Sequence, residues 1–140
     1  MNIKKLGLSA IAGFVVMLGL GGLAHMYLLK DWFMAHLGAA GNLSRPEPKG
    51  LYIMAGTGVL ACIMAYIYPK GVEGNNKIME GLKFGAIMGV LFIVPFSLIL
   101  YGVTTVFSGQ AILMNTGLHI VIQGLGGLTI AYVYGDNPKA

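Results

Sequence analysis

The sequence predicts an all-α integral membrane protein, a four-helix bundle made of two helical hairpins that form a single transmembrane domain over residues 1–140. The first observation behind this prediction is composition: 56% of the residues are hydrophobic and only 10% are charged, whereas roughly a quarter are charged in soluble domains. The second is that the charges concentrate in the tails and loops between four apolar runs. A bilayer core needs about 20 apolar residues per helix, which these runs supply at 6–29, 51–68, 79–107 and 111–134.

The first run, 6–29, follows Lys4 and Lys5, and signal peptides share this pattern of charge before an apolar stretch. The run is longer than the apolar core of a signal peptide, which spans about 7 to 15 residues, and no small-x-small cleavage site follows it cleanly. We therefore expect it to be retained as a membrane span.

The distribution of basic residues predicts the orientation of the spans. With a cytoplasmic N-terminus, six basic residues are cytoplasmic (Lys4, Lys5, Lys70, Lys77, Lys83, Lys139) and three are external (Lys30, Arg45, Lys49). The positive-inside rule then favours an N-in/C-in arrangement. These charges form no clustered basic patch with aromatic or groove-reading elements, so nucleic-acid binding is not expected.

The external loop and the second run, 51–68, carry interfacial signals. Residues 31–37 are amphipathic enough to lie along the membrane surface, with Trp32 and Phe33 at headgroup depth. Cys62 lies in the middle of the second run, and we interpret it as a small buried apolar residue.

The second and fourth runs end in similar five-residue motifs, AYIYP at 65–69 and AYVYG at 131–135. The similarity is compatible with a parallel internal repeat. It is equally compatible with an aromatic belt at the membrane surface, which favours tyrosine at such positions without any duplication.

The third run, 79–107, is preceded by Asn76, a suitable helix N-cap. Gly81, Gly85 and Gly89 recur every four residues on one face, giving two overlapping GxxxG motifs that allow another helix to approach closely. This strip predicts either an interface with a second chain or packing within the chain. Pro95 removes a backbone hydrogen bond in the middle of the run.

The fourth run, 111–134, follows a connection of residues 108–110, so short that the third and fourth helices must be antiparallel neighbours. It places Asn115, His119 and Gln123 on one helical face. Polar residues at membrane depth usually face a bundle interior or a wet cavity. The stripe is either a ligand site or a set of hydrogen bonds between helices.

In the predicted topology, His25 and His119 fall in the same external half of the membrane, and His36 lies in the loop nearby. Together with Met26, Met34, Met54 and Met114 in this layer, they make a haem or Cu(I) site chemically conceivable. The chain has neither an HxxxH nor a CxxCH motif. No cofactor is therefore assigned, and His25, Asn115, His119 and Gln123 are the candidate ligand-binding residues.

Three segments carry a resemblance to known proteins: AHMYLLKDW at 24–32, EGLKFGAIMG at 80–89 followed by Pro95 and Tyr101, and NTGLHIV at 115–121. In the order of these signals the chain resembles a family of small four-span bacterial inner-membrane proteins of unknown function. The resemblance covers most of the chain. It implies a helical bundle in a bacterial inner membrane and no active-site residue.

Function is expected to be non-enzymatic, because no carboxylate pair is placed for acid–base chemistry and no nucleophile has a base at a fixed spacing. The first hypothesis is an accessory or structural subunit of a homo-oligomer or larger membrane complex, packing through Gly81, Gly85 and Gly89. The alternative is a protein that binds or transports a small molecule, haem or metal through the polar stripe. Beyond the lipid bilayer, the partners expected are a second copy or other membrane subunits.

Overall fold

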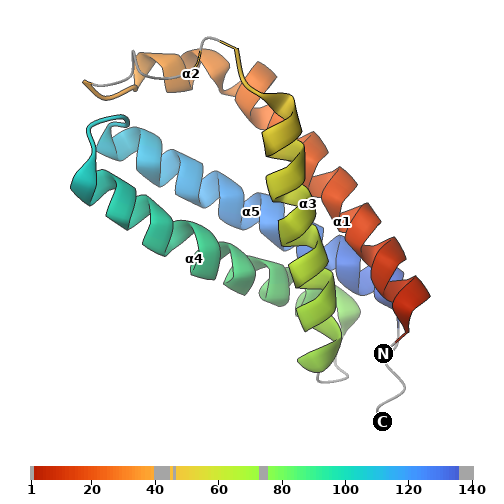
Figure 1. The fold of residues 1–140 in the computed structure, drawn as a ribbon. Helices are drawn as coiled ribbons and strands as arrows, with labels where there is room; N and C mark the ends of the chain where they lie inside the picture. Colours follow the sequence, from red (N-terminus) through yellow and green to blue (C-terminus); the bar gives the residue numbers. More distant parts are fainter. Residues whose placement is uncertain (1, 40–44, 46, 73–75, 136–140) are drawn as a thin grey trace.

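The structure, a computed structural model, describes residues 2–39, 45, 47–72 and 76–135. Its elements follow the order of the apolar runs (Figure 1). They are α1 (Ile3–Leu23), the π-helical turn η1 (Ala24–Leu28), α2 (Lys30–Ala35), α3 (Gly50–Ile67), the 3-10 turn η3 (Tyr68–Lys70), α4 (Lys77–Val103) and α5 (Gly109–Tyr134). Lys139, which the charge count above places in the cytoplasm, lies outside the described residues.

Four helical stretches are long and apolar enough to cross a membrane, namely Ile3–Leu28, Gly50–Lys70, Lys77–Val103 and Gly109–Tyr134. This confirms the prediction of an all-α chain with four candidate membrane spans. Their outer faces carry large exposed apolar side chains, such as Val15, Val59, Leu98 and Val121. Such a surface suits contact with lipid, which solvates apolar side chains as well as a protein core does.

Side-chain caps begin three of the long helices, as their sequences suggest. The Asn2 side chain accepts hydrogen bonds from the N–H groups of Lys4 and Lys5 at 3.0 and 3.2 Å. The Asn76 side chain accepts from Ile78 N–H at 2.9 Å, and Ser108 Oγ accepts from an N–H of the first turn of α5. Each cap satisfies a backbone donor that the helix itself leaves without a partner.

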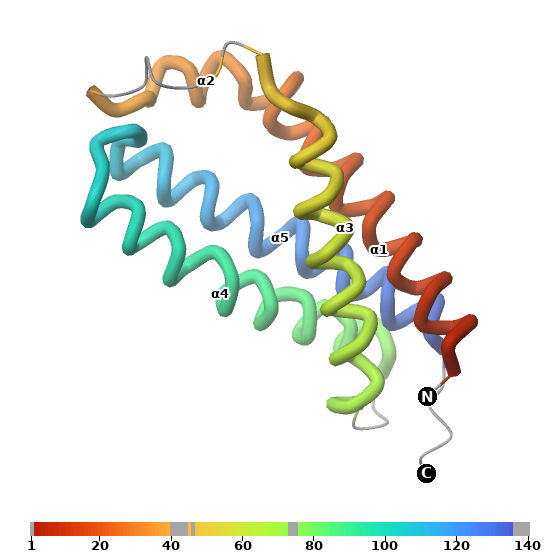
Figure 2. Tube along the Cα trace, in the orientation of Figure 1, coloured from red at the N-terminus to blue at the C-terminus, as the bar shows by residue number. Residues whose placement is uncertain are grey.

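The helices pack side by side in the order α3, α1, α5, α4 (Figure 2). α4 lies along α5, and α1 lies between α5 and α3. The end of α3 that adjoins α2 diverges from α4, whereas the two helices approach at the opposite end of the bundle (Figure 1). The two hairpins, α1 with α3 and α4 with α5, are therefore joined mainly through α1 and α5.

The glycine strip of α4 is covered by α5. Gly81, Gly85 and Gly89 are buried, and ideal β-carbons built on them would approach carbon atoms of α5 to 2.7, 2.8 and 2.9 Å. α5 meets the strip with its own small residues, Gly124, Gly127 and Ala131. The strip thus packs against α5 within the chain, the second of the two alternatives that the sequence left open, and α5 occupies the surface that a partner helix would need.

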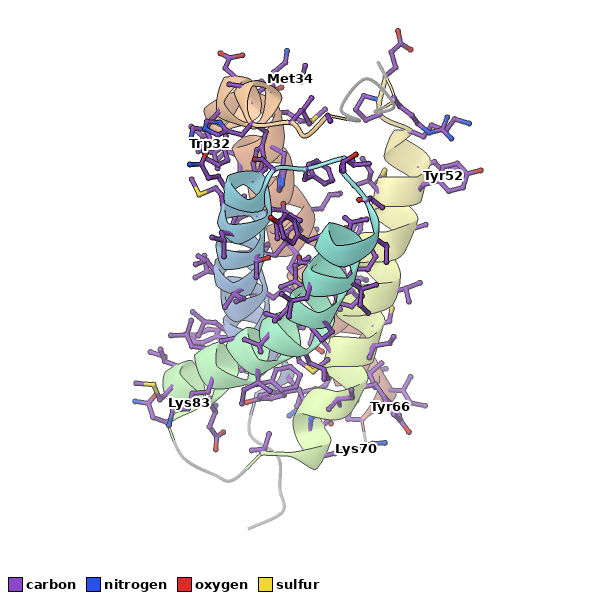
Figure 3. The ribbon with its side chains drawn as sticks, turned by 90° about the vertical axis from the view of Figure 1, so that its left-hand side faces the viewer. Trp32, Met34, Tyr52, Tyr66, Lys70 and Lys83 are labelled. Atoms are coloured by element: carbon purple, nitrogen blue, oxygen red, sulfur yellow. The ribbon has the colours of Figure 1, made fainter. Side chains whose placement is uncertain are left out.

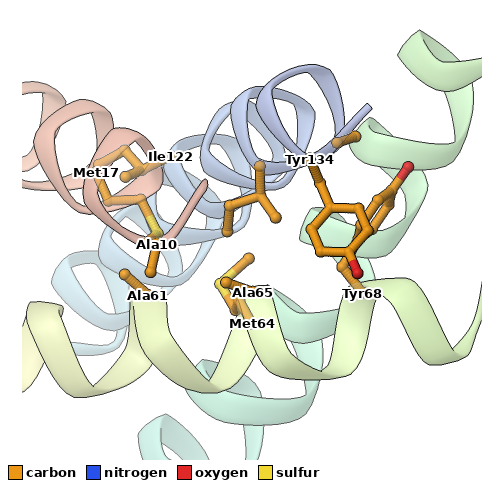
Figure 4. Packing of buried hydrophobic residues seen from close by; sticks show 10 residues of the cluster. Ala10, Met17, Ala61, Met64, Ala65, Tyr68, Ile122 and Tyr134 are labelled. Atoms are coloured by element: carbon orange, nitrogen blue, oxygen red, sulfur yellow. The ribbon is translucent and has the colours of Figure 1, made fainter. Parts of the chain in front are cut away.

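A core of buried apolar residues joins α1, α3 and α5 (Figure 4). On α3 it consists of Ala61, Met64 and Ala65, which recur at the spacing of one helical face. Cys62 lies off this face and is exposed, so its interpretation as a buried residue is wrong. The same packing that buries Ala61 and Ala65 against α1 turns Cys62 outward.

The two similar motifs meet at the end of the bundle opposite α2. Tyr68 and Tyr134, the second tyrosines of AYIYP and AYVYG, are both buried, with ring centroids 6.2 Å apart and an interplanar angle of 71°. Tyr66 and Tyr132 are exposed. Of each motif, therefore, one tyrosine packs in the bundle and the other faces outward.

Aromatic and basic side chains gather at both ends of the bundle (Figure 3). Trp32 and Tyr52 lie at the α2 end, and Tyr66, Lys70 and Lys83 lie at the other. The Lys70 ammonium group is 3.6 Å from the centroid of the Tyr66 ring, a cation–π contact. Membrane helices characteristically carry such residues where they leave the hydrocarbon core.

The third predicted span, 79–107, extends too far, because α4 ends at Val103. Thr104 is extended, with φ −138° and ψ 162°, in keeping with the run of β-branched residues at 103–106, which favours extended backbone. The connection to α5 therefore comprises residues 104–108 instead of 108–110. α4 and α5 are nevertheless antiparallel neighbours, as predicted.

Candidate functional site

His25 lies in the π-helical turn that ends the first span. In this turn the Leu29 N–H donates to the Ala24 carbonyl at 2.8 Å, one residue further along than in an α-helix. Such wide turns are rare, and they occur frequently at functional sites. His25 is half-buried, and its ring stacks on Phe33 of α2, with centroids 5.2 Å apart and an interplanar angle of 10°.

Both ring nitrogens of His25 have polar partners. Nδ1 is 3.0 Å from the Gly21 carbonyl oxygen, which can only accept, so Nδ1 carries a hydrogen and donates it. Nε2 is 2.9 Å from Oδ1 of Asn115 on α5. With Nδ1 donating, Nε2 of the neutral ring accepts, and the Asn115 amide turns its NH₂ group toward it.

The three residues of the predicted polar stripe of α5 do not share one environment. Asn115 pairs with His25, and the ring of His119 lies 5.5 Å from that of His25, centroid to centroid. Gln123 is only 2% exposed, and its Oε1 has no hydrogen-bond partner among the described residues. A β-carbon on Gly89 would lie 3.3 Å from that oxygen. Gln123 therefore lies in the α4–α5 contact, away from the other three candidates.

α2 is tied to the connection between α4 and α5 by a short backbone pairing. Leu37 and Phe107 form an antiparallel bridge. The Gly38 N–H donates to the Val106 carbonyl at 2.9 Å, and the Ser108 N–H donates to the His36 carbonyl at 3.3 Å. The His36 ring stacks on Trp32, with centroids 4.1 Å apart. This pairing holds α2 across the end of the bundle, above His25.

A cavity of about 280 Å³ lies beneath α2, between it, the end of α1, α4 and α5. Its lining residues are His25, Lys30, Phe33, Met34, Phe96, Ser97, Leu100, Phe107, Ala111, Ile112 and Asn115. Ser97 and Ala111 are buried and, with the half-buried Asn115, form its floor, whereas Lys30, Met34 and Phe96 are exposed and form its rim. The cavity thus has apolar walls and a small number of polar groups, the usual composition of a small-molecule site.

Ser97 on the floor is oriented by a neighbour. The Thr116 hydroxyl of α5 donates to Ser97 Oγ at 3.0 Å, so the Ser97 hydroxyl retains its own hydrogen for another acceptor. Ser97, His25 and Asn115 bring three polar groups from three different helices to one end of the bundle.

Of the four candidate residues, His25 and Asn115 line the cavity, whereas His119 and Gln123 do not. Sequence reasoning missed the rest of the lining, including Lys30, Ser97 and Phe107. Ser97 did carry a signal, since it is a polar residue in the most apolar part of the third run. Lys30 and Phe107 carried none, because they approach the cavity only through the fold of α2 and of the α4–α5 connection.

The methionines of this layer do not gather around the histidines. The side chains of Met26, Met34, Met54 and Met114 are all exposed, and only Met34 among them lines the cavity. Within the described ranges, no group of three or more His, Cys, Asp or Glu side chains is placed to hold a metal ion. The donor set that the structure brings together is better suited to hydrogen-bonding an organic molecule.

No protein-family model, curated protein or solved structure matches the chain.

Proposed function

We propose that this chain is a non-enzymatic multi-pass membrane protein that binds a small, largely apolar organic molecule in the cavity beneath α2. The observation that carries the proposal is the cavity itself, about 280 Å³ in volume, with Phe33, Phe96 and Phe107 in its walls and polar groups at its floor. Its volume lies just below the range of about 300–1,000 Å³ that is usual for small-molecule sites. At about 30 Å³ per water molecule, it corresponds to roughly nine waters, which suits one substituted ring.

The other candidate functions have less support. A haem macrocycle is larger than this cavity, and a metal site would need more ligating side chains than His25 and His119 provide. An accessory subunit that packs through Gly81, Gly85 and Gly89 would need a surface that α5 covers. Among these functions, small-molecule binding is the one that an observed feature of the described residues supports directly.

The setting that we propose is a bacterial inner membrane with both termini in the cytoplasm. This orientation puts the lysine-rich end, with Lys70 and Lys83, inside. The cavity and α2 then lie at the external surface, where a ligand can arrive from the water or from the outer leaflet.

The experiment is ligand-observed saturation-transfer NMR on the purified protein in nanodiscs, with 4-hydroxyacetophenone, a neutral aromatic ketone, as the probe. Empty nanodiscs give the signal due to partition into lipid. We expect saturation transfer above that level with the wild-type protein and none with Ala111→Leu, which adds volume to the cavity floor.

Val121→Leu, on an exposed face of the same helix, serves as the matched control and is expected to behave as wild type. Ile112→Phe fills the cavity from another position, so the result does not depend on one variant. Circular dichroism checks that each variant is folded. Equal signals from the wild type, Ala111→Leu and Ile112→Phe would refute binding in this cavity.

A further inference from the structure

The polar groups of the cavity differ between its rim and its floor. At the rim, Lys30 is the one Lys, Arg, Asp or Glu side chain among the described residues that line the cavity. At the floor, the side chains of Ser97 and Asn115 are uncharged. A ligand that satisfies both ends therefore carries a negative charge at one end and a neutral hydrogen-bonding group at the other.

The floor residues offer neutral hydrogen-bonding groups. Ser97 Oγ already accepts from Thr116, so the Ser97 hydroxyl donates to whatever faces it. Asn115 contacts His25 Nε2 with one group of its amide, which leaves the other amide group for a ligand. Ser97 and Asn115 therefore require a ligand oxygen that forms hydrogen bonds, because an apolar group there would leave them without the hydrogen bonds that water would give them.

Between rim and floor the walls are aromatic. Phe33, Phe96 and Phe107 come from α2, α4 and the α4–α5 connection, and Phe33 is held in place by its stacking on His25. Aromatic side chains favour other rings through offset stacked and edge-to-face contacts. The middle of the ligand is therefore best matched by a single aromatic ring.

We propose that the ligand is a small aromatic carboxylate bearing a polar oxygen on the far side of its ring, with the carboxylate at Lys30 and the oxygen at Ser97 and Asn115. This inference rests on the proposed function, and it adds the chemical class of the ligand. Recognition at the rim is electrostatic, and recognition at the floor is by neutral hydrogen bonds, so each can be removed separately.

The test compares three probes that differ at one end only: 4-hydroxybenzoate, its neutral counterpart 4-hydroxybenzamide, and benzoate, which lacks the hydroxyl group. Dissociation constants are measured in nanodiscs at neutral pH, with empty nanodiscs as the partition control. We expect 4-hydroxybenzoate to bind the wild-type protein most tightly, by roughly fivefold or more over each of the others, the size of an exposed ion pair or one hydrogen bond.

The variants assign each end of the ligand to its residue. Lys30→Gln is expected to weaken 4-hydroxybenzoate roughly fivefold and to leave 4-hydroxybenzamide unchanged, while Lys30→Arg retains binding. Ser97→Ala is expected to weaken 4-hydroxybenzoate and to leave benzoate unchanged. Lys49→Gln removes the same charge from the same end of the bundle, at a residue that does not line this cavity, and is expected to have no effect.

The outcomes separate this inference from the proposed function. If 4-hydroxybenzamide binds as tightly as 4-hydroxybenzoate and Lys30→Gln has no effect on either, the carboxylate is overturned while binding in the cavity stands. If benzoate binds as tightly as 4-hydroxybenzoate, the role of the floor is overturned. If none of these probes binds, and 4-hydroxyacetophenone does not bind either, both proposals fail together.

Discussion

At the scale of single residues, the His25 imidazole is held from four directions. The Gly21 carbonyl and the Asn115 side chain contact its two nitrogens, while the rings of Phe33 and His119 lie beside it. A side chain with this many partners has little freedom to change rotamer. His25 therefore serves as a fixed point that links the end of α1 to α5 and supports the Phe33 wall of the cavity.

The His25–Asn115 hydrogen bond predicts an energetic coupling between the two residues. In a double-mutant cycle with His25→Ala and Asn115→Ala, we expect a coupling of about 0.6 to 1.7 kcal/mol, the range measured for hydrogen bonds between membrane helices. The free energy of unfolding is measured by titration with a denaturing detergent.

A second cycle, with His25→Ala and Thr129→Ala, provides the control for this coupling. The Thr129 hydroxyl donates to the Leu125 carbonyl of its own helix, so its coupling to His25 is expected to be near zero. Equal coupling in the two cycles would mean that the His25–Asn115 contact contributes nothing specific to stability.

At the scale of elements, α4 and α5 owe their close approach to small residues on both helices. The Gly85 backbone fits against Gly124 and Gly127, and without side chains between them the two backbones make extensive van der Waals contact. This approach also positions the cavity, because Ser97 on α4 and Asn115 on α5 face it only when the helices keep this rotation about their axes.

Gly85→Ala is predicted to destabilise the protein, because its β-carbon would lie 2.8 Å from Gly124 Cα. Overpacking of this kind costs about 1 to 3 kcal/mol. Gly102→Ala, in the same helix, meets nothing within 4 Å and is expected to change stability by less than about 0.5 kcal/mol. Unfolding in mild detergent measures both. A Gly85→Ala variant that keeps its unfolding free energy but loses a native oligomer would restore the strip as an interface between chains.

At the scale of the whole molecule, the four long helices form two hairpins that meet along α1 and α5. The apolar outer surface suits lipid, and basic and aromatic side chains at each end suit the two membrane surfaces (Figure 3). Lys70, Lys77 and Lys83 lie at the end opposite α2, so the positive-inside rule predicts that this end is cytoplasmic.

Labelling with a membrane-impermeant maleimide tests this orientation. In a Cys62→Ala background, Lys83→Cys is expected to react in inside-out vesicles, and Lys49→Cys in intact spheroplasts. Cys62 in the unmodified chain is the control, because it faces outward from the middle of α3, where lipid excludes the charged reagent. The reverse labelling pattern would place the cavity on the cytoplasmic side.

The number of spans, their approximate bounds and the polar face of α5 were open to prediction from the sequence. The length of an apolar run and its 3.6-residue period are local properties that can be read from a single stretch of sequence. A bilayer needs apolar helices about 20 residues long, and residues three or four positions apart share a helical face. Errors arose where local rules compete, as at Val103, where β-branched residues end an apolar helix early. Cys62 was misplaced because an apolar helix in lipid does not reveal which of its faces is buried.

What the sequence determined by itself is therefore the class of the protein, four apolar helices with charged ends. Only the tertiary structure decided which faces meet: that the glycine strip of α4 packs against α5, and that His25 reaches Asn115 across 90 residues of sequence. It also decided that α2, with Lys30 in its first turn, lies over Ser97 and leaves a cavity between them. The physical reason is that these contacts depend on how each helix is rotated and crossed against its neighbours. That geometry is set by packing summed over distant segments, which no single segment encodes.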